Sequence, residues 1–174
     1  VDPFTGTGTF ITRLLQSGLI TQDQLAYKYQ QEIHANEIVL LAYYIAAINI
    51  EQVYHDIMGG SYVPFNGICL TDTFALYEKE DLVDSAQTDN STRRKNQKKL
   101  DIRVIVGNPP YSAGQTSAND NNANIEYKSL DERIRNTYAE HSTATSTKNL
   151  MDSYIRAIRW ASDRIGDAGV LAYV

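Results

Sequence analysis

The sequence predicts an α/β fold with a doubly wound, mostly parallel sheet. Two observations support this prediction: short apolar runs alternate with longer segments of helical pattern, and two of these runs end in an acidic residue or at a rigid proline turn. Strands that alternate with helices form parallel sheets through right-handed crossovers, and such sheets bind ligands at the carboxyl ends of their strands. Functional residues are therefore expected where each predicted strand ends.

The predicted elements follow one another in a regular order. After an opening strand end, the predicted strands cover 29–35, 67–72, 102–106 and 170–174. The predicted helices are amphipathic or apolar on nearly all sides, and they cover 9–17, 37–50, 74–83 and 150–165. Two polar stretches are expected to be flexible surface insertions, near 84–99 and near 112–147, and the second contains a possible short helix over 130–138.

The composition fits one globular domain. The chain has 174 residues, of which 43% are hydrophobic and 21% charged, with no run as long as a membrane span and no signal pattern at its start. Cys69 is the single cysteine and is expected to be an inert buried thiol, and the three histidines are scattered, so neither a disulfide nor a metal site is expected. We expect one cytoplasmic domain over 1–174, cut from a larger protein at both ends.

The charge balance argues against a free-standing nucleic-acid binder. The formal net charge is -5, whereas such binders carry a basic excess. The basic run over 93–99 leads into the amino end of the strand at 102–106, away from the expected ligand side, and is predicted to be a solvated loop. Regions outside this chain would therefore have to hold any nucleic acid.

A glycine-containing loop, DPFTGTG, covers residues 2–8 after the opening strand. Glycine lets the backbone approach a ligand closely, and the helix that follows offers free N–H groups to an anion. A dinucleotide-binding loop would have a third glycine where Ile11 stands, and a phosphate loop would have Gly-Lys-Ser/Thr. Both phosphate-binding interpretations are therefore disfavoured, and a tight turn without a ligand stays an alternative.

Acidic residues stand at the ends of three predicted strands. Asp2 suits a cationic group such as the amino group of a bound amino acid, and Asp72 suits an adenine amino group. Glu37 stands where doubly wound folds place the acid that accepts hydrogen bonds from ribose hydroxyls. Each acid taken singly has an alternative role as a helix cap or a partner of the helix dipole. Three such acids together favour a ligand-binding edge.

The most specific motif is Asn108-Pro109-Pro110-Tyr111, directly after a β-branched strand. Two prolines restrict the backbone, so the Asn108 side-chain oxygen and the Pro109 carbonyl oxygen can be held as paired acceptors beside an aromatic ring. Such a pair suits a planar amino group, because the two oxygens would accept hydrogen bonds from its two N–H groups. The alternative is a Pro-Pro turn with a surface tyrosine.

These motifs resemble those of the amino-methyltransferases. The loop over 2–8 resembles motif I and the turn over 108–111 resembles motif IV, in the order of the gamma class, and Glu37 and Asp72 match the acids of motifs II and III. The surrounding segments HANEIVLLAYYIAAINIE, VIVGNPPYSAGQ and DSYIRAIRWASDRI resemble the methylase part of large single-polypeptide type ISP restriction–modification enzymes. The resemblance covers nearly the whole chain.

The resemblance implies a Rossmann-like methyltransferase sheet, S-adenosyl-L-methionine as methyl donor, and the N6 amino group of adenine in DNA as acceptor. The adenine would be flipped out of double-stranded DNA, and helicase, nuclease and target-recognition parts of the same polypeptide would be partners. The implied catalytic residues are Asn108, Pro109, Pro110 and Tyr111. The implied cofactor-binding residues are Asp2, Pro3, Phe4, Thr5, Gly6, Gly8, Glu37, Ile38, Asp72 and Thr73.

One position departs from the family pattern, and other functions stay open. Some relatives place an aromatic residue beside the cofactor adenine where this chain has Thr73, so Ile38 and its apolar neighbours are expected to form that wall. A methyltransferase of RNA or of a glutamine side-chain amide, and a catalytically silent cofactor-binding domain, are alternatives. A dehydrogenase is disfavoured by Ile11 and leaves the motif over 108–111 unexplained.

Overall fold

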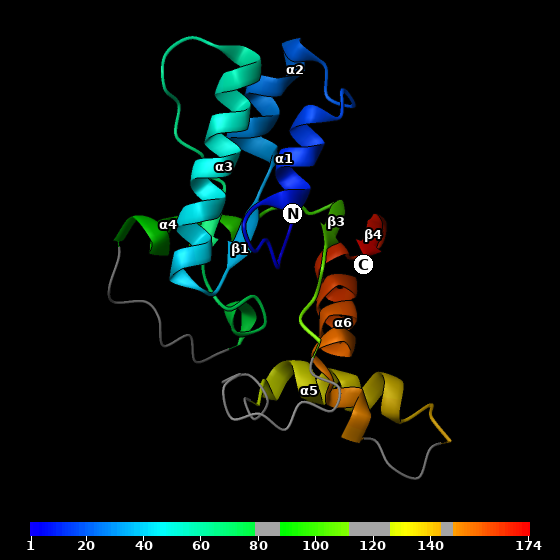
Figure 1. The fold of residues 1–174 in the computed structure, drawn as a ribbon. Coiled ribbons are helices and arrows are strands. Elements are labelled where there is room, and N and C mark those ends of the chain that lie inside the picture. Colours follow the sequence, from blue (N-terminus) through cyan, green and yellow to red (C-terminus); the bar gives the residue numbers. More distant parts are fainter. Residues whose placement is uncertain (79–87, 112–125, 144–147) are drawn as a thin grey trace.

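The computed structural model describes residues 1–78, 88–111, 126–143 and 148–174, and it has an α/β fold with short parallel strands (Figure 1). The strands are β1 Ala35–Glu37, β2 Ile68–Leu70, β3 Val104–Gly107 and β4 Val170–Tyr173. β1 pairs with β2, and β3 pairs with β4, in parallel in both cases. The expected α/β class with parallel strands is thereby confirmed.

The N-terminal segment joins the two strand pairs. The Asp2 amide donates to the His34 carbonyl oxygen, and the Asn36 amide donates to the Asp2 carbonyl oxygen, both at 2.9 Å. On the other side, the Val106 amide donates to the Val1 carbonyl oxygen at 3.0 Å. The order across the molecule is therefore β2, β1, the N-terminal segment, β3 and β4. The order reverses between the N-terminal segment and β3, and open α/β sheets bind ligands at such a point.

Helices lie above and below the strands in the view of Figure 1. α1 Thr9–Gln16, α2 Gln22–Tyr27 and α3 Leu40–Met58 occupy the upper half, and α5 Lys128–Ile134 and α6 Ser153–Ile165 the lower half. α4 Thr88–Lys98 packs against β2. The shorter helical turns are η1 Lys28–Glu32, η2 Ala75–Tyr77, η3 Arg135–Ala139 and η4 Lys148–Met151.

Two apolar cores stabilise this arrangement. The first lies among α1, α2, α3, β1 and β2, and it includes the fully buried side chains of Tyr29 and Ile50. The second lies among η2, β3, α5 and α6, and it includes Ile105 and Ile134, which are also fully buried. Burial of apolar area, at roughly 25 cal/mol per Å², is the main stabilising contribution in such cores.

Gly8 allows α1 to approach α3 closely. Its φ of 89° lies in the left-handed region, where side chains are strained, and α1 begins at the next residue. A Cβ atom at Gly8 would lie 3.2 Å from Ile50 Cγ1 and 3.4 Å from the Cα atom of Ala46, both on α3. Packing between the two helices therefore requires glycine at this position, independently of any ligand.

The second strand lies later in the chain than the sequence predicts. The prediction of a strand over 29–35 is wrong except at Ala35, because most of that range forms the helical turn η1 and the strand is β1. α3 begins at Leu40, after the predicted start, and ends later than predicted. Tyr29 is buried by stacking on Tyr54 of α3, with ring centroids 3.7 Å apart. Tyr29 is therefore buried by tertiary packing and not by the alternation of inward and outward side chains along a strand.

The apolar sequence of the first half of α3 predicts burial on nearly all sides, but the structure buries only one side of the helix. Leu41, Tyr44 and Ile48 are 70%, 51% and 64% exposed, whereas Ala46 and Ile50 are fully buried. The exposed residues follow helical spacing, so they form one apolar stripe on the outer side of the helix. Only the inner side of α3 covers the strands.

The surface loop expected over 84–99 is a helix in its described part, α4. The Asn90 side chain donates to the Leu70 carbonyl oxygen and accepts from the Leu70 amide, both at 2.9 Å, and so covers the free edge of β2 as a further strand would. Arg94 and Gln97 are also buried. The prediction of a solvated loop is therefore wrong, because polar side chains are buried here by tertiary contacts that composition does not indicate.

The second expected insertion, over 112–147, contains α5 and η3 in its described part. The buried residues Leu130 and Ile134 hold α5 in the second core, and the helix expected over 130–138 is confirmed with an earlier start. Residues 112–125 and 144–147, and residues 84–87 of the first insertion, lie outside the described residues. No helix in the described ranges combines the length and hydropathy needed to span a bilayer.

Candidate active site

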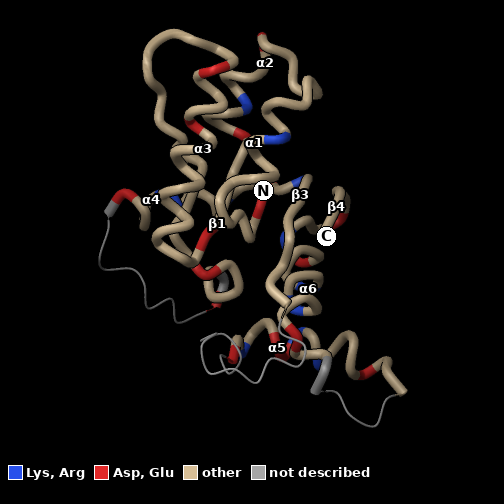
Figure 2. Tube along the Cα trace, in the orientation of Figure 1, with Lys and Arg blue, Asp and Glu red and all other residues tan. Residues whose placement is uncertain are grey.

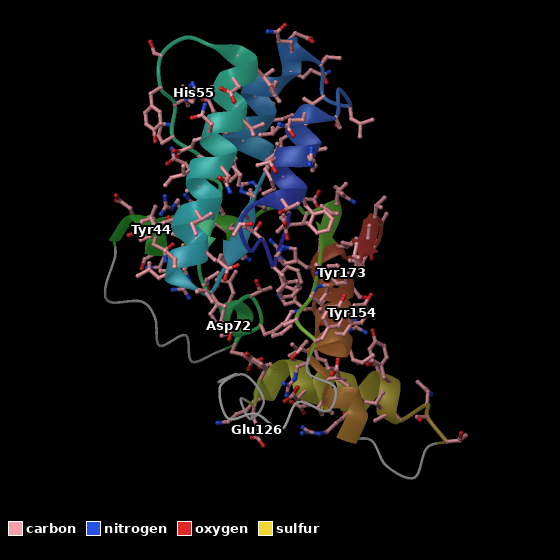
Figure 3. All side chains as sticks on the ribbon, in the orientation of Figure 1. Tyr44, His55, Asp72, Glu126, Tyr154 and Tyr173 are labelled. Atoms are coloured by element: carbon pink, nitrogen blue, oxygen red, sulfur yellow. The ribbon has the colours of Figure 1, made fainter. Side chains whose placement is uncertain are left out.

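A cavity of about 220 Å³ lies where the segments that follow the strands meet. Its lining residues come from the glycine-containing loop, from the ends of β1 and β2, from the turn after β3, and from the residue before α5. They are Pro3, Phe4, Gly6, Asn36, Glu37, Ile38, Thr71, Asp72, Thr73, Phe74, Asn108, Pro110 and Tyr127. Figure 3 shows Asp72 near the lower end of the strands, with Tyr154 and Tyr173 across from it on α6 and β4.

The cavity brings together most of the residues predicted from the sequence. The predicted residues in its lining are Pro3, Phe4, Gly6, Glu37, Ile38, Asp72, Thr73, Asn108 and Pro110. The predicted residues that do not line it are Asp2, Thr5, Gly8, Pro109 and Tyr111. The acids at the ends of β1 and β2 and the amide after β3 therefore share one cavity, although they come from distant parts of the chain.

Glu37 fixes the glycine-containing loop. One carboxylate oxygen accepts from the Gly6 amide at 2.8 Å, and the other accepts from the Val39 amide at 2.7 Å. Gly6 has a φ of 55°, and a Cβ atom there would meet nothing within 4 Å, so the loop presents bare backbone at this point. Each carboxylate oxygen has a further lone pair, so Glu37 can accept additional hydrogen bonds from a ligand.

Asp72 is held from two sides. Its Oδ1 accepts from the Phe74 amide at 2.9 Å, which caps η2, and its Oδ2 accepts from the Tyr127 hydroxyl at 2.7 Å. The neighbouring Thr73 is buried, and its hydroxyl donates to the Pro3 carbonyl oxygen at 2.6 Å. The end of β2 is therefore tied both to the glycine-containing loop and to the start of α5.

Four lining residues were missed by the sequence analysis: Asn36, Thr71, Phe74 and Tyr127. Phe74 places an aromatic ring in the lining one residue after Thr73, and this ring packs against that of Phe4 with centroids 5.4 Å apart. An aromatic residue next to the strand end was a signal that could have identified it. Tyr127 carries no such signal, because it stands in a polar stretch far from the motifs.

Asp2 is buried beside the cavity and not in its lining. Its carboxylate accepts from the Phe4 amide at 3.2 Å, and only 1% of the residue is exposed. Burial raises the pKa of Asp2 to about 6. A Cβ atom at Gly107 would lie 2.9 Å from Asp2 Oδ1, so β3 also passes close to this carboxyl group. In this structure Asp2 stabilises the turn of the loop, and its contact with a ligand amino group stays a prediction.

The turn after β3 presents Asn108 to solvent and buries Pro109. Tyr111 is 60% exposed, and its hydroxyl lies 2.9 Å from Asn108 Oδ1 and 2.8 Å from the Val174 carbonyl oxygen. The Tyr111 ring is nearly parallel to the ring of Tyr154, with centroids 6.2 Å apart. The amide oxygen of Asn108 is therefore within reach of the cavity and of an exposed aromatic face at the same time.

Comparison with known proteins finds this chain similar to segments of solved DNA complexes. The sequence matches no family model and no curated protein. It is similar, over 99% of its length, to the solved structure of a nuclease-deletion mutant of the type ISP restriction–modification enzyme LlaGI in complex with a DNA substrate mimic, at 49% identity and a TM-score of 0.89. It is also similar over 99% of its length to the ATP-dependent type ISP enzyme LlaBIII bound to DNA, at 51% identity and a TM-score of 0.89.

A third solved structure, a DrdV–DNA complex, matches 99% of this chain at 46% identity and a TM-score of 0.87. The chain spans only 15%, 12% and 16% of the LlaGI, LlaBIII and DrdV chains. It is therefore similar in sequence and in fold, over almost its whole length, to one segment of much longer proteins solved with DNA, two of which are type ISP restriction–modification enzymes.

Proposed function

We propose that this chain is the core of a DNA adenine-N6 methyltransferase that uses S-adenosyl-L-methionine, within a restriction–modification enzyme. The observation that supports this proposal is the shared cavity: the amide of Asn108 lies in the same lining as Gly6, Glu37 and Asp72. A group that accepts hydrogen bonds from an amine is thus next to bare loop backbone and two acids that suit a nucleoside.

The described lining fits the nucleoside part of the cofactor. Glu37 would accept hydrogen bonds from the ribose hydroxyls and Asp72 one from the adenine amino group, while Ile38 and Phe74 would contact the purine ring. The cavity of about 220 Å³ is smaller than the roughly 300 Å³ or more of pockets that enclose drug-sized ligands, so it suits the nucleoside and not the complete cofactor. When bound, the cofactor supplies an electrophilic methyl group on a sulfonium.

Asn108 and Pro109 would orient the acceptor amine. The exocyclic nitrogen of adenine is a poor nucleophile because its lone pair is delocalised into the ring. Two acceptors that bind its hydrogens would favour a pyramidal nitrogen whose lone pair faces the methyl group that the cofactor supplies. Asn108 Oδ1 accepts from the Tyr111 hydroxyl and has a second lone pair that the amine could use.

DNA would be held mainly by other regions of the protein. Figure 2 shows Lys and Arg interspersed with Asp and Glu along the described chain in this view. The net charge of -5 also favours DNA binding by other regions, because phosphate contacts require an excess of Lys and Arg. The helicase, nuclease and target-recognition parts of the proposed enzyme, and a flipped adenine as substrate, are part of this proposal.

A product assay tests the function. Full-length protein is incubated with labelled S-adenosyl-L-methionine and with double-stranded DNA, RNA or a protein extract, and the labelled product is hydrolysed and separated. We expect the label in N6-methyladenine from DNA. Label in RNA or in glutamine would support the alternative acceptors, and binding of the cofactor without any product would support a silent domain.

Glu37→Ala is expected to lower the affinity for S-adenosyl-L-homocysteine about ten-fold or more, because hydrogen bonds to a charged group contribute about 1.5–3 kcal/mol. Glu37→Gln keeps one acceptor and is expected to lose less. The matched control is Glu51→Ala, which removes a carboxylate that also accepts from a backbone amide, that of Phe65 at 2.9 Å, but outside the cavity. Calorimetry that gives equal affinities for Glu37→Ala and wild type would remove Glu37 from the site.

Tyr111→Phe is expected to keep most of the activity, whereas Tyr111→Ala is expected to weaken capture of the flipped base by roughly 5-fold to 150-fold, since stacking on an aromatic side chain contributes about 1–3 kcal/mol per base. The phenylalanine variant keeps the exposed ring and loses only the hydroxyl contacts with Asn108 Oδ1 and the Val174 carbonyl oxygen. Single-turnover kinetics with a DNA substrate separates the two variants. If phenylalanine is as damaging as alanine, the phenol takes part in the chemistry and the stacking role is wrong.

A further inference from the structure

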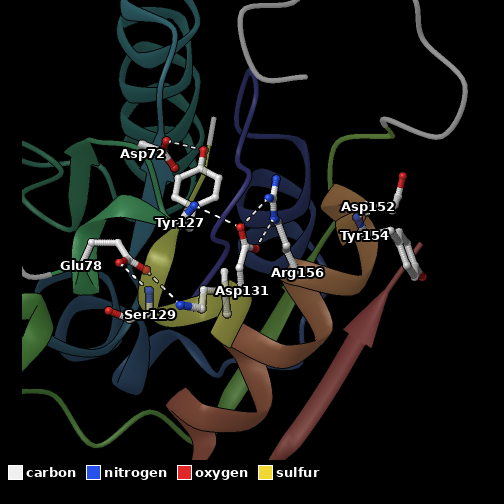
Figure 4. Close-up of polar contacts among 9 residues, drawn as sticks. Asp72, Glu78, Tyr127, Ser129, Asp131, Asp152, Tyr154 and Arg156 are labelled. Atoms are coloured by element: carbon white, nitrogen blue, oxygen red, sulfur yellow. Dashed lines mark hydrogen bonds and ion pairs between the residues drawn. The ribbon is translucent and has the colours of Figure 1, made fainter. Parts of the chain in front are cut away.

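Tyr127 connects the candidate cavity to the second core (Figure 4). The residue is only 4% exposed, yet its hydroxyl reaches Asp72 Oδ2 at 2.7 Å, across 55 positions of sequence. Its ring packs edge-on against the ring of Phe74, with centroids 5.3 Å apart. The side chain therefore touches two lining residues with different parts, and the hydroxyl can be deleted without removing the ring.

A buried ion pair holds Tyr127 in place. Arg156 of α6 and Asp131 of α5 form two parallel contacts of 2.8 Å, and both side chains are less than a tenth exposed. Asp131 also accepts from the Tyr127 amide at 3.3 Å, and the Arg156 guanidinium carbon lies 5.1 Å from the centre of the Tyr127 ring. Bidentate ion pairs of this kind fix the relative orientation of the two side chains in addition to neutralising their charges.

A second carboxylate fixes the start of α5 from the side of η2. Glu78 accepts from the Ser129 amide at 2.9 Å and from the Leu130 amide at 3.0 Å, so the first turn of α5 is capped by a residue from the segment that follows Asp72 (Figure 4). Tyr127 therefore stands between elements that are tied together on both sides. Its hydroxyl has little freedom to leave Asp72.

The contact with Tyr127 determines which way the Asp72 carboxylate faces. With Oδ1 on the Phe74 amide and Oδ2 on the Tyr127 hydroxyl, rotation of the carboxylate would break one bond or both. Burial, and then the nearby Asp72 charge, raise the pKa of Tyr127, so its hydroxyl stays protonated and remains a donor across the physiological pH range. The remaining lone pairs of Asp72 keep one fixed direction relative to the cavity.

We propose that Tyr127, clamped by the Asp131–Arg156 pair, is a positioning residue that orients Asp72 to select a purine with an exocyclic amino group. The inference rests on the proposed function, because the purine is that of the cofactor. Asp72 makes the contact with the ligand, and Tyr127 acts only through it. A carboxylate that is free to rotate would bind an amino group less well and would discriminate less strongly against a purine with a carbonyl group in its place.

The test compares two probes in full-length protein by calorimetry: S-adenosyl-L-homocysteine and its inosine counterpart, in which a carbonyl oxygen replaces the adenine amino group. For Tyr127→Phe we expect affinity for the adenosine probe to fall about five-fold, the range of one lost hydrogen bond, with little change for the inosine probe. In an Asp72→Ala background the same substitution should have no further effect on either affinity, since the effects of substitutions at coupled residues are not additive.

Two further variants separate positioning from a general loss of stability. Tyr29→Phe is the matched control, because it deletes a buried hydroxyl that donates to the Val63 carbonyl oxygen at 3.0 Å in the other core, and it should leave both affinities unchanged. Arg156→Lys breaks the bidentate contact but keeps the charge. It should cause part of the loss of preference for the adenosine probe that is expected for Tyr127→Phe.

Each outcome decides between the proposals. Binding of the adenosine probe by the wild type, together with loss of preference in Tyr127→Phe, supports the inference. If Tyr127→Phe weakens both probes equally or neither probe, the positioning role is wrong while the proposed function stands. If the full-length wild type binds neither probe, the proposed cofactor site is wrong and the role of Tyr127 is overturned with it.

Discussion

Asn108→Ala is expected to lower the rate constant of methyl transfer by about 10²–10³-fold at saturating cofactor, the range found when a preorganised hydrogen-bonding group that acts in the transition state is removed. Asn108 lines the cavity, and within the described part of the chain its amide oxygen accepts from the Tyr111 hydroxyl. Cofactor affinity should change by less than about two-fold, because Asn108 is proposed to bind the acceptor amine and not the donor.

Single-turnover kinetics with full-length protein and a DNA substrate measures this rate constant, and calorimetry measures cofactor affinity separately. Asn108→Asp is the informative companion, since it keeps an oxygen acceptor at the same position and should lose less activity than Asn108→Ala. A variant that binds the cofactor poorly but transfers methyl groups at the wild-type rate once saturated would contradict the proposed role. Asn108 would then belong to the cofactor site.

Asp131→Ala is expected to lower the free energy of unfolding by about 3–5 kcal/mol, because it leaves the Arg156 guanidinium buried without its carboxylate. Both side chains of this pair are less than a tenth exposed, so water cannot replace the lost partner. Asp131 also accepts from the Tyr127 amide at 3.3 Å, and that contact is lost together with the ion pair.

Denaturant unfolding provides the measurement, and the chain offers a matched control. Asp101→Ala breaks the Arg103–Asp101 pair, whose side chains are 60% and 72% exposed, and it should cost only about 0–1 kcal/mol because the solvent screens both charges. If both substitutions have equally small effects, the buried pair does not stabilise the second core. Replacing Asp131 and Arg156 together by apolar residues should cost less than Asp131→Ala alone.

The position of the candidate site could be predicted from the sequence because its chemistry is local. Gly6, Glu37, Asp72 and Asn108 each stand at or shortly after the end of an extended segment, and the carboxyl ends of parallel strands meet at one edge. The sequence predicted less well which residue of a motif faces the ligand. Asp2 belongs to the first motif yet is buried beside the cavity, because direction depends on how the loop folds over its neighbours.

Two of the wrong predictions, those for α4 and for the start of α3, have the same physical reason. α4 is polar throughout and was assigned to a loop, yet Asn90 is buried by hydrogen bonds to the edge of β2. The start of α3 is apolar and was assigned to the interior, yet Leu41 and Ile48 are exposed. Hydropathy describes a side chain by itself, whereas burial depends on the surface that another element presents to it.

The sequence by itself determined the α/β class, the parallel strands and the motif residues at their ends, because the alternation of apolar runs and the backbone restrictions of glycine and proline act over a few residues. Only the tertiary structure decided that Tyr127 contacts Asp72 and that the Asp131–Arg156 pair supports Tyr127. These contacts join residues that are 55 and 25 positions apart. A buried hydrogen bond is favourable only when both partners are brought together by the packed chain, so no local pattern indicates it.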